Sequence, residues 1–169
     1  AVGTVMTNMG FSKFCEANGI DFVSTKVGDR YVLESMLQNG YNIGGEQSGH
    51  IIFLDHSTTG DGELSGAMLL SIMKRTGEKL SDLAKIMERY PQVLINVKVS
   101  NEGKLSFYTD KEVKAEINRV TEILGDTGRI LVRVSGTEPL VRVMLEGENL
   151  EQIQTLAEEA AQVVRERLA

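Results

Sequence analysis

A chain of 169 residues that is 41% hydrophobic has the composition of an ordinary globular protein with one large domain or two small ones. Its formal net charge of −6 argues against a nucleic-acid or membrane partner, because both favour basic surfaces. Cys15 is the single cysteine, which excludes an intrachain disulfide and favours a reducing, cytoplasmic location. The first residues resemble a buried strand and not a signal peptide, so we expect the chain to be part of a longer protein.

The first forty residues predict two strands that alternate with two helices. Asn8 is expected to cap a helix that stops at Asn18-Gly19 and whose inner side carries apolar residues. This order is typical of an α/β layer with parallel strands. The strands are expected at residues 2–6 and 20–27, the second helix at residues 30–38, and the inner residues of the first helix are Phe11, Phe14 and Cys15.

A glycine-rich segment, residues 44–50, then leads into an apolar stretch that predicts a strand over residues 51–54. Thr59-Gly60-Asp61-Gly62 is expected to open a further helix. Ser81 is expected to cap another one that carries Leu83, Ile86 and Met87 on one side. The apolar residues of the helix after Gly62 are Leu64, Ala67, Met68, Leu69, Leu70 and Met73.

The pattern changes after Pro91, so we place a domain boundary near this residue and expect domains over residues 1–92 and 93–169. Thr109 or Asp110 is expected to cap a helix that ends near Leu124. Strands are expected at residues 93–99, 129–134 and 140–147. A last helix, capped by Asn149 and running to about Leu168, is expected to bury Ile153, Leu156, Ala157, Ala160 and Val164.

The segment Arg133-Val134-Ser135-Gly136-Thr137-Glu138-Pro139, followed by Arg142, is the strongest functional signal. A phosphate dianion needs several converging donors, and this segment offers guanidinium groups, hydroxyls and backbone N–H groups together. Strand alternation places Arg133 and Arg142 opposite the apolar faces of their strands. Two alternatives remain open. The segment is also an ordinary turn between surface strands, and Glu138 either orients an arginine or is simply solvated.

The glycine-rich segment offers Glu46 and Ser48, which would project from one side of an extended backbone. A carboxylate and a hydroxyl together suit neighbouring sugar hydroxyls. An ordinary β-turn with exposed polar residues is the alternative. His50 follows at the start of an apolar strand, where it either contacts a substrate or serves as a structural histidine.

Asp29 and Arg30 lie at a strand-to-helix junction, where ligands often meet open α/β sheets. The alternative is that the pair caps the helix. Asp61 and Glu63 are two nearby carboxylates, but a helix start attracts acids through its dipole, so we expect no metal site. With two histidines in the chain and no convincing acid partner, a hydrolase triad is not expected.

Three motifs in this order resemble the α-D-phosphohexomutase superfamily: Gly44-Gly45-Glu46-Gln47-Ser48-Gly49-His50, Thr58-Thr59-Gly60-Asp61-Gly62 and Arg133-Val134-Ser135-Gly136-Thr137-Glu138-Pro139. Two features narrow the resemblance to the bacterial phosphoglucosamine mutases: the segment Thr25-Lys26-Val27-Gly28-Asp29-Arg30-Tyr31-Val32 and the form of the Gly-Gly-Glu-Gln-Ser-Gly-His loop. Each motif alone is moderately specific, whereas their combination, which covers essentially the whole chain, is specific.

The resemblance is to the third and fourth of the family's four domains. It implies a three-layer α/β domain with a mixed sheet, without its extreme N-terminus, followed by a smaller α+β domain with an antiparallel sheet and helices on one face. It also implies that Glu46 and Ser48 contact sugar hydroxyls, and we add His50, Asp29 and Arg30 as candidates. The implied phosphate-binding residues are Arg133, Ser135, Gly136, Thr137 and Arg142.

Members of the family interconvert glucosamine 6-phosphate and glucosamine 1-phosphate through a bisphosphate intermediate. A phosphoserine in the first domain transfers the phosphoryl group, and Mg²⁺ is bound by an Asp-Gly-Asp-Gly-Asp-Arg loop in the second. The phosphoserine motif does not occur here, and Gly60-Asp61-Gly62 is only a partial match to the metal loop. We therefore expect no catalytic residue in this chain, no activity of the chain alone, and a phosphorylated hexosamine and the missing N-terminal domains as its partners. The alternatives are a phosphomannomutase or phosphoglucomutase of the same superfamily, or a non-enzymatic phosphosugar-binding module.

Overall fold

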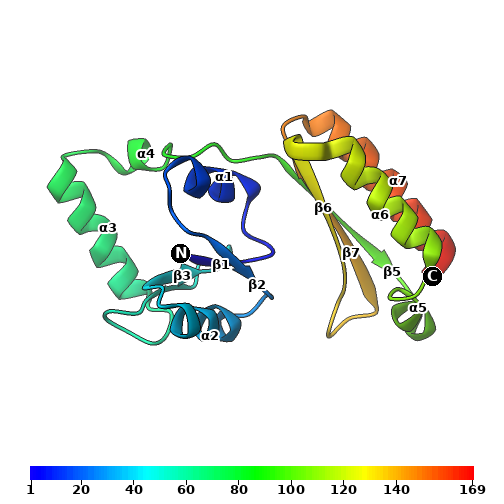
Figure 1. Ribbon diagram of the computed structural model, residues 1–169, viewed down its shortest axis with the longest axis horizontal. Helices are drawn as coiled ribbons and strands as arrows, with labels where there is room; N and C mark the ends of the chain where they lie inside the picture. The colour runs from blue at the N-terminus through cyan, green and yellow to red at the C-terminus, as the bar shows by residue number, and fades with distance from the viewer. The chain divides into compact units, whose positions relative to one another are not determined.

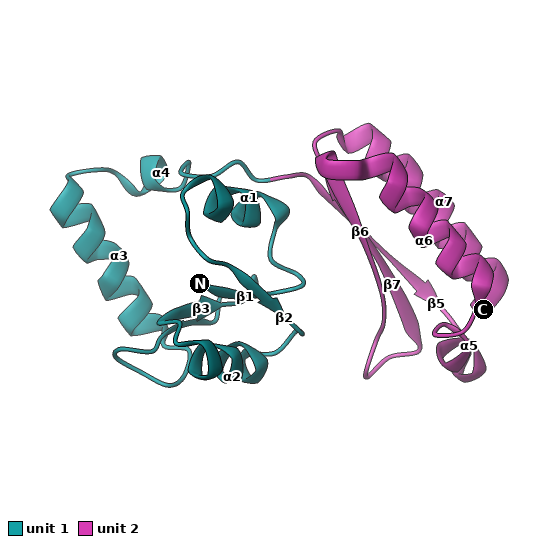
Figure 2. Cartoon of the chain, in the orientation of Figure 1, with its two compact units in different colours: residues 1–89 teal, residues 90–169 magenta.

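The computed structural model describes residues 1–169 and divides them into two compact units, Ala1–Arg89 and Tyr90–Ala169 (Figure 2). Unit 1 denotes the first of these and unit 2 the second. No helix in either unit has both the length and the apolar character that a membrane crossing requires.

Unit 1 contains a four-stranded mixed sheet in the order β2-β1-β3-β4. Strand β1 pairs in parallel with β2 and β3, whereas β4 pairs antiparallel with β3. The mixed sheet agrees with the expected fold class, but β3, which overlaps the start of the glycine-rich segment, was not predicted as a strand. The strands are β1 (Val2–Thr4), β2 (Val23–Thr25), β3 (Ile43–Gly45) and β4 (Ile51–Phe53).

The helices of unit 1 begin largely where the sequence predicts. Asn8 accepts a hydrogen bond from the N–H of Gly10, so its expected cap is confirmed. The helix expected to open at residues 59–62 begins at Gly62, where Asp61 accepts the N–H of Leu64 as its cap. Figure 1 shows strands β1 and β2 between α1 and α2, in separate layers. The helices are α1 (Met9–Ala17), α2 (Asp29–Asn39), α3 (Gly62–Thr76) and α4 (Leu80–Leu83).

The predicted helix cap at Ser81 is wrong. Ser81 lies inside the short helix α4, whose N-cap residue is Lys79, and the helix ends at Leu83. Ile86 and Met87 therefore lie beyond the helix, and the side chain of Ile86 is 65% exposed. A short amphipathic pattern does not sustain a helix when no buried surface covers its apolar residues.

The core of unit 1 lies between α2 and the sheet, where Val2, Val32, Met36 and Ile52 are buried together. Gly44 explains how closely α2 packs onto β3. A Cβ atom at this position would lie 2.5 Å from the sulfur of Met36 and 2.6 Å from a methyl carbon of Val32. Part of the glycine-rich segment is therefore required by packing rather than by ligand binding.

Unit 2 is an antiparallel sheet in the order β5-β7-β6, with α6 and α7 side by side on one face (Figure 1). The strands are β5 (Gln92–Lys98), β6 (Gly128–Val134) and β7 (Leu140–Gly147). The helices are α5 (Asn101–Ser106), α6 (Lys111–Leu124), the 3₁₀ turn η1 (Gly125–Thr127) and α7 (Leu150–Leu168). This arrangement agrees with the expected α+β class.

Asp110, and not Thr109, caps α6 by accepting a hydrogen bond from Val113, and Asn149 caps α7 as expected. Every residue that the sequence analysis placed on the inner side of α7 is buried. The short helix α5 was not predicted. Ser100 caps this helix, and Gly103 is buried against the main chain of Leu168 at the C-terminal end of α7. This packing, which the local sequence does not reveal, accounts for the position of the helix.

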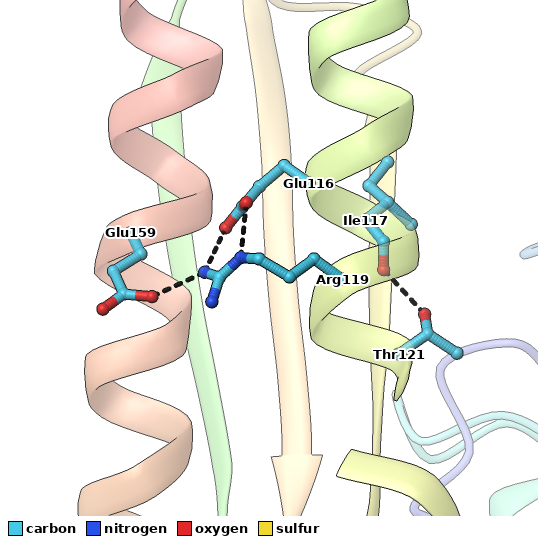
Figure 3. Close-up of polar contacts among 5 residues, drawn as sticks. All are labelled: Glu116, Ile117, Arg119, Thr121 and Glu159. Atoms are coloured by element: carbon cyan, nitrogen blue, oxygen red, sulfur yellow. Dashed lines mark hydrogen bonds and ion pairs between the residues drawn. The ribbon is translucent and has the colours of Figure 1, made fainter. Parts of the chain in front are cut away.

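Arg119 links the two long helices of unit 2 (Figure 3). Its Nη2 lies 2.7 Å from Oε1 of Glu116 on the same helix and 2.6 Å from Oε2 of Glu159 on α7. The nearby hydroxyl of Thr121 donates to the main-chain oxygen of Ile117 at 2.8 Å. Solvent screens these contacts, so the hydrophobic core between the helices and the sheet carries most of the stability.

Candidate functional site

The two arginines of the predicted phosphate turn occupy directly opposite positions on adjacent strands. Arg133 on β6 pairs in register with Arg142 on β7, between the pairs Val132–Val143 and Val134–Val141. Val141 and Val143 are fully buried against the helices, so both arginines leave the other face of the sheet. The expected facing of the two side chains is confirmed. Residues in such opposite positions have Cβ atoms about 5 Å apart.

The positive charge at this position is only partly balanced. Arg142 Nη2 lies 2.7 Å from Oε2 of Glu138, which shows that Glu138 pairs with an arginine. The Nε of Arg142 is buried without a hydrogen-bond partner, and the guanidinium of Arg133 has neither a hydrogen bond nor an ion pair. Burial and the neighbouring charge of Arg142 both lower the pKa of Arg133. Like charges with unused donors at one position favour the binding of an anion.

The turn between the strands is held by its own hydrogen bonds. Ser135 is 3% exposed, and its hydroxyl oxygen accepts the N–H of Glu138 at 3.2 Å. The N–H of Ser135 donates to the carbonyl of Leu140 at 2.8 Å, and the N–H of Leu140 donates to the carbonyl of Glu138 at 2.8 Å. Gly136 and Thr137 are exposed at the tip. The hydroxyl of Ser135 thus stabilises the turn as an acceptor, and a hydroxyl that accepts one hydrogen bond still has a proton that it can donate.

Lys104 also contacts the turn, although the sequence analysis did not single it out. Its Nζ donates to the main-chain oxygen of Glu138 at 3.0 Å. Lys104 lies on α5, about thirty positions before the turn, and only the tertiary fold brings the two together. The single sequence signal was the presence of a basic residue soon after the end of β5.

The glycine-rich segment forms a hairpin turn between β3 and β4. The N–H of Glu46 donates to the carbonyl of His50 at 2.9 Å, and the N–H of Gly49 donates to the carbonyl of Glu46 at 3.0 Å. Gly49 has a φ of 99°, which only glycine adopts readily. The extended backbone assumed for Glu46 and Ser48 is therefore wrong. Instead, the hydroxyl of Ser48 lies 3.1 Å from Nδ1 of the exposed His50.

The carboxylate of Glu46 joins this hairpin to the strand-to-helix junction at the start of α2. Its Oε1 accepts the N–H of Gly28 at 2.8 Å, so two segments chosen separately from the sequence lie together. Asp29 accepts the N–H of Arg30, and Arg30 pairs through Nε with Glu34 along the same helix at 2.8 Å. The side chain of Arg30 is 81% exposed. The structure thus brings together Glu46 and the backbone of Gly28, whereas Arg30 is paired along its own helix.

A pocket of about 520 Å³ opens in unit 1 beside the hairpin. Glu46, Gln47 and Asn8 contribute polar groups to its wall. The apolar part of the wall is formed by Val2, Phe11, Ile43, Ile51 and Met87. Glu46 therefore lies where a carboxylate can face both the pocket and the N-terminus of α2.

The residues of this chain do not fit a Mg²⁺ site. Asp61, the acidic residue of the Thr58–Gly62 motif, caps α3 through a hydrogen bond of 2.9 Å from Leu64. Residues 1–169 include no group of three or more His, Cys, Asp and Glu side chains arranged to hold a metal ion. Mg²⁺ binds through several oxygen ligands, and these side chains do not supply such a set.

Comparison with protein-family models gives a match along nearly the whole chain. Residues 1–90 match the phosphoglucomutase/phosphomannomutase alpha/beta/alpha domain III, and residues 94–163 match the phosphoglucomutase/phosphomannomutase C-terminal domain. The chain belongs to the phosphoglucomutase/phosphomannomutase family.

Among curated relatives of this family member, the phosphoglucosamine mutase of Caldanaerobacter subterraneus subsp. tengcongensis is 53% identical over 167 residues. The phosphoglucosamine mutase of Clostridioides difficile is 52% identical over 168 residues. The alignments cover 99% of this chain but 37% and 38% of these relatives, so the chain spans little more than a third of their length.

Solved structures of the family share the fold. N-acetylphosphoglucosamine mutase from Aspergillus fumigatus superposes with a TM-score of 0.85 at 19% identity, over 98% of this chain and 38% of that protein. A complex of the same fungal enzyme with GlcNAc-6P and magnesium gives a TM-score of 0.84 at 18% identity, over 99% of this chain and 39% of that protein. At this level of identity the match establishes the architecture of the two units and not their ligands.

Proposed function

We propose that this chain is the substrate-binding part of a phosphoglucosamine mutase, which interconverts glucosamine 6-phosphate and glucosamine 1-phosphate through a bisphosphate intermediate. The observation that carries the proposal is the in-register pair Arg133 and Arg142, with donors left unused on both guanidinium groups. The names of the relatives that are 52% and 53% identical support the choice of sugar phosphate.

In this proposal the turn of unit 2 binds the phosphate that is not being transferred. Arg133 and Arg142 supply charge-assisted hydrogen bonds, and the exposed backbone N–H groups of Gly136 and Thr137 complete the set of donors. The hydroxyl of Ser135 donates its remaining proton to a phosphate oxygen. An anion bound here also reduces the repulsion between the two like charges that lie opposite each other.

Unit 1 recognises the sugar in the same proposal. Glu46 has one carboxylate oxygen on the N–H of Gly28 and a second that can accept from sugar hydroxyls. Ser48 and His50, which lie 3.1 Å apart, form a further polar contact, with Asp29 and Arg30 at the nearby start of α2. The phosphoserine and Mg²⁺ belong to the other domains of a full-length cytoplasmic enzyme.

Titration of glucosamine 6-phosphate into the chain, followed by calorimetry, tests the phosphate site. Arg133→Ala and Arg142→Ala should each lose about 1.5–3 kcal/mol of binding free energy, the usual value of a hydrogen bond to a charged group. Arg75→Ala, which changes an exposed arginine of α3, is the matched control and should bind as the wild type does. Equal affinity of all four proteins contradicts the assignment.

Turnover assays test the remainder of the proposal. Phosphoryl transfer depends on a positioned nucleophile and on charge neutralisation, so the chain alone should show no mutase activity. The full-length protein should convert glucosamine 6-phosphate faster than glucose or mannose phosphates. Turnover by the isolated chain, or a clear preference for mannose phosphate, would overturn this part.

A further inference from the structure

Helix α5 has a fixed place beside the C-terminal end of α7. The N–H of Ser100 donates to the carbonyl of Leu168 at 3.2 Å, and the hydroxyl of Ser100 caps α5 by accepting the N–H of Gly103 at 2.9 Å. Gly103 is buried, and a Cβ atom there would collide with the main-chain carbonyl of Leu168. A short helix held at two points presents its next side chain, Lys104, from a defined position.

The segment that contains α5 donates two hydrogen bonds to main-chain oxygens of the turn between β6 and β7. Lys104 Nζ donates to the carbonyl of Glu138 at 3.0 Å, and the N–H of Val99 donates to the carbonyl of Pro139 at 3.1 Å. An ammonium group carries three donors, so Lys104 keeps two after it binds Glu138. Its charge lies next to a turn that already carries Arg133 and Arg142.

Charge at this position is unevenly distributed. Three cationic side chains, from Lys104, Arg133 and Arg142, are associated with the turn, whereas Glu138 is the one carboxylate that contacts any of them. Lys104 binds the main-chain oxygen of Glu138 and not its carboxylate, so its charge is not neutralised by that contact.

We propose that Lys104 is a positioning residue of the phosphate site: it holds the turn through the carbonyl of Glu138 and adds a third positive charge to the surroundings of the anion. The inference rests on the proposed phosphate-binding role of the turn. Lys104 lies on α5, outside the Arg133–Pro139 motif. The phosphate site therefore includes a residue that does not belong to the β6–β7 hairpin.

Three substitutions separate the two effects. Lys104→Arg keeps a charged donor, Lys104→Gln keeps a donor without charge, and Lys104→Met keeps neither. Lys114→Met, on the exposed side of α6, is the matched control. The probe is inorganic phosphate, added to the 169-residue chain and followed by the NMR shift of the Gly136 N–H.

Lys104→Met should weaken phosphate binding by about fivefold, the upper end of the usual range for one partly exposed charged contact. Lys104→Gln should lie between Met and wild type, Lys104→Arg should bind within about threefold of wild type, and the salt dependence should decrease only where the charge is lost. Unfolding temperatures measured on the same samples identify any variant that is misfolded. If Lys104→Met is misfolded, the affinities of Lys104→Arg and Lys104→Gln for phosphate test the role of Lys104.

Comparison of Arg142→Ala with the Lys104 variants distinguishes a failure of the Lys104 proposal from a failure of the proposed phosphate site. If Arg142→Ala loses phosphate binding while Lys104→Met and Lys104→Gln bind like wild type, the role of Lys104 is wrong and the phosphate site stands. If Arg142→Ala binds like wild type as well, the phosphate site itself is wrong.

Discussion

Arg133 and Arg142 lie directly opposite each other on β6 and β7, and only Arg142 has an anionic partner, Glu138. Like charges in opposite positions destabilise a strand pair. The hairpin therefore carries an unfavourable contact that a bound anion would relieve.

Removal of the Glu138 carboxylate should strengthen phosphate binding. In the unliganded turn this carboxylate holds Nη2 of Arg142 at 2.7 Å and so competes with an incoming anion. Glu138→Gln should lower the dissociation constant for inorganic phosphate about fivefold, in line with the roughly 1 kcal/mol of an exposed ion pair. Calorimetric titration measures the change. Glu122→Gln, a substitution on exposed α6 surface, is the control, and weaker binding by Glu138→Gln would indicate that Glu138 orients Arg142 rather than competing.

Loss of the Glu46 side chain should destabilise unit 1, because its carboxylate accepts the N–H of Gly28 at 2.8 Å across two loops. A hydrogen bond to a charged group contributes about 1.5 kcal/mol or more, so Glu46→Ala should lower the free energy of unfolding by that amount. Urea denaturation compares it with Gln47→Ala, an exposed neighbour in the same turn. Equal stability of the two variants would refute a structural role for the contact.

The buried carboxylate of Glu146 makes unit 2 sensitive to the loss of Arg129. Glu146 is fully buried, with Arg129 Nη2 2.8 Å from its Oε2 and Gln92 Nε2 donating to its Oε1 at 3.0 Å. Arg129→Met should destabilise the chain by about 3 kcal/mol, because it leaves a buried charge without its partner.

Two further variants test this explanation by chemical denaturation. Adding Glu146→Leu to Arg129→Met should restore much of the loss, since a buried ion pair can be replaced by apolar side chains. Arg119→Met breaks the two ion pairs that its half-exposed guanidinium makes with Glu116 and Glu159, and it should change stability by only about 1 kcal/mol. A double variant that is no more stable than Arg129→Met alone would exclude the unpaired charge as the cause.

Two helical glycines of unit 1 should respond in opposite directions to alanine. A Cβ atom at Gly10 would collide with the main-chain oxygen of Glu88, whereas nothing lies within 4 Å of one at Gly66. Gly10→Ala should destabilise by about 1–3 kcal/mol through overpacking, and Gly66→Ala should stabilise by about 0.5–1 kcal/mol through helix propensity. Thermal unfolding of both variants checks the prediction, which fails if they shift in the same direction.

Acid should remove part of the stabilisation of α6. The hydrogen bond from Val113 and the contact with Arg167 lower the pKa of Asp110 below its ordinary value of 3.8. A lowered pKa in the folded state stabilises the protein above the unfolded pKa, and this stabilisation is lost as pH falls through the folded pKa. The difference in unfolding free energy between wild type and Asp110→Asn should therefore be present at pH 6 and shrink below about pH 4. A constant difference across this range would show that the charge of Asp110 contributes nothing.

The parts of the fold that the sequence predicted correctly depend on neighbours along the chain. Asn8 and Asn149 each cap a helix whose first turn follows directly. The two arginines were placed on the outer face because alternation in a strand is a local property. Strand β3 was missed because its two glycines indicate a turn, whereas Gly44 is required by the approach of Val32 and Met36.

The sequence by itself determined the order of the elements, the family and the face from which Arg133 and Arg142 project, since capping and alternation act within a few residues. Only the tertiary structure decided that Glu46 accepts the N–H of Gly28 and that Lys104 reaches the carbonyl of Glu138. These contacts join residues 18 and 34 positions apart, and they depend on the packing that brings the two segments of each pair together. Hydrogen bonds between distant residues follow from that packing, and no local pattern in the chain encodes them.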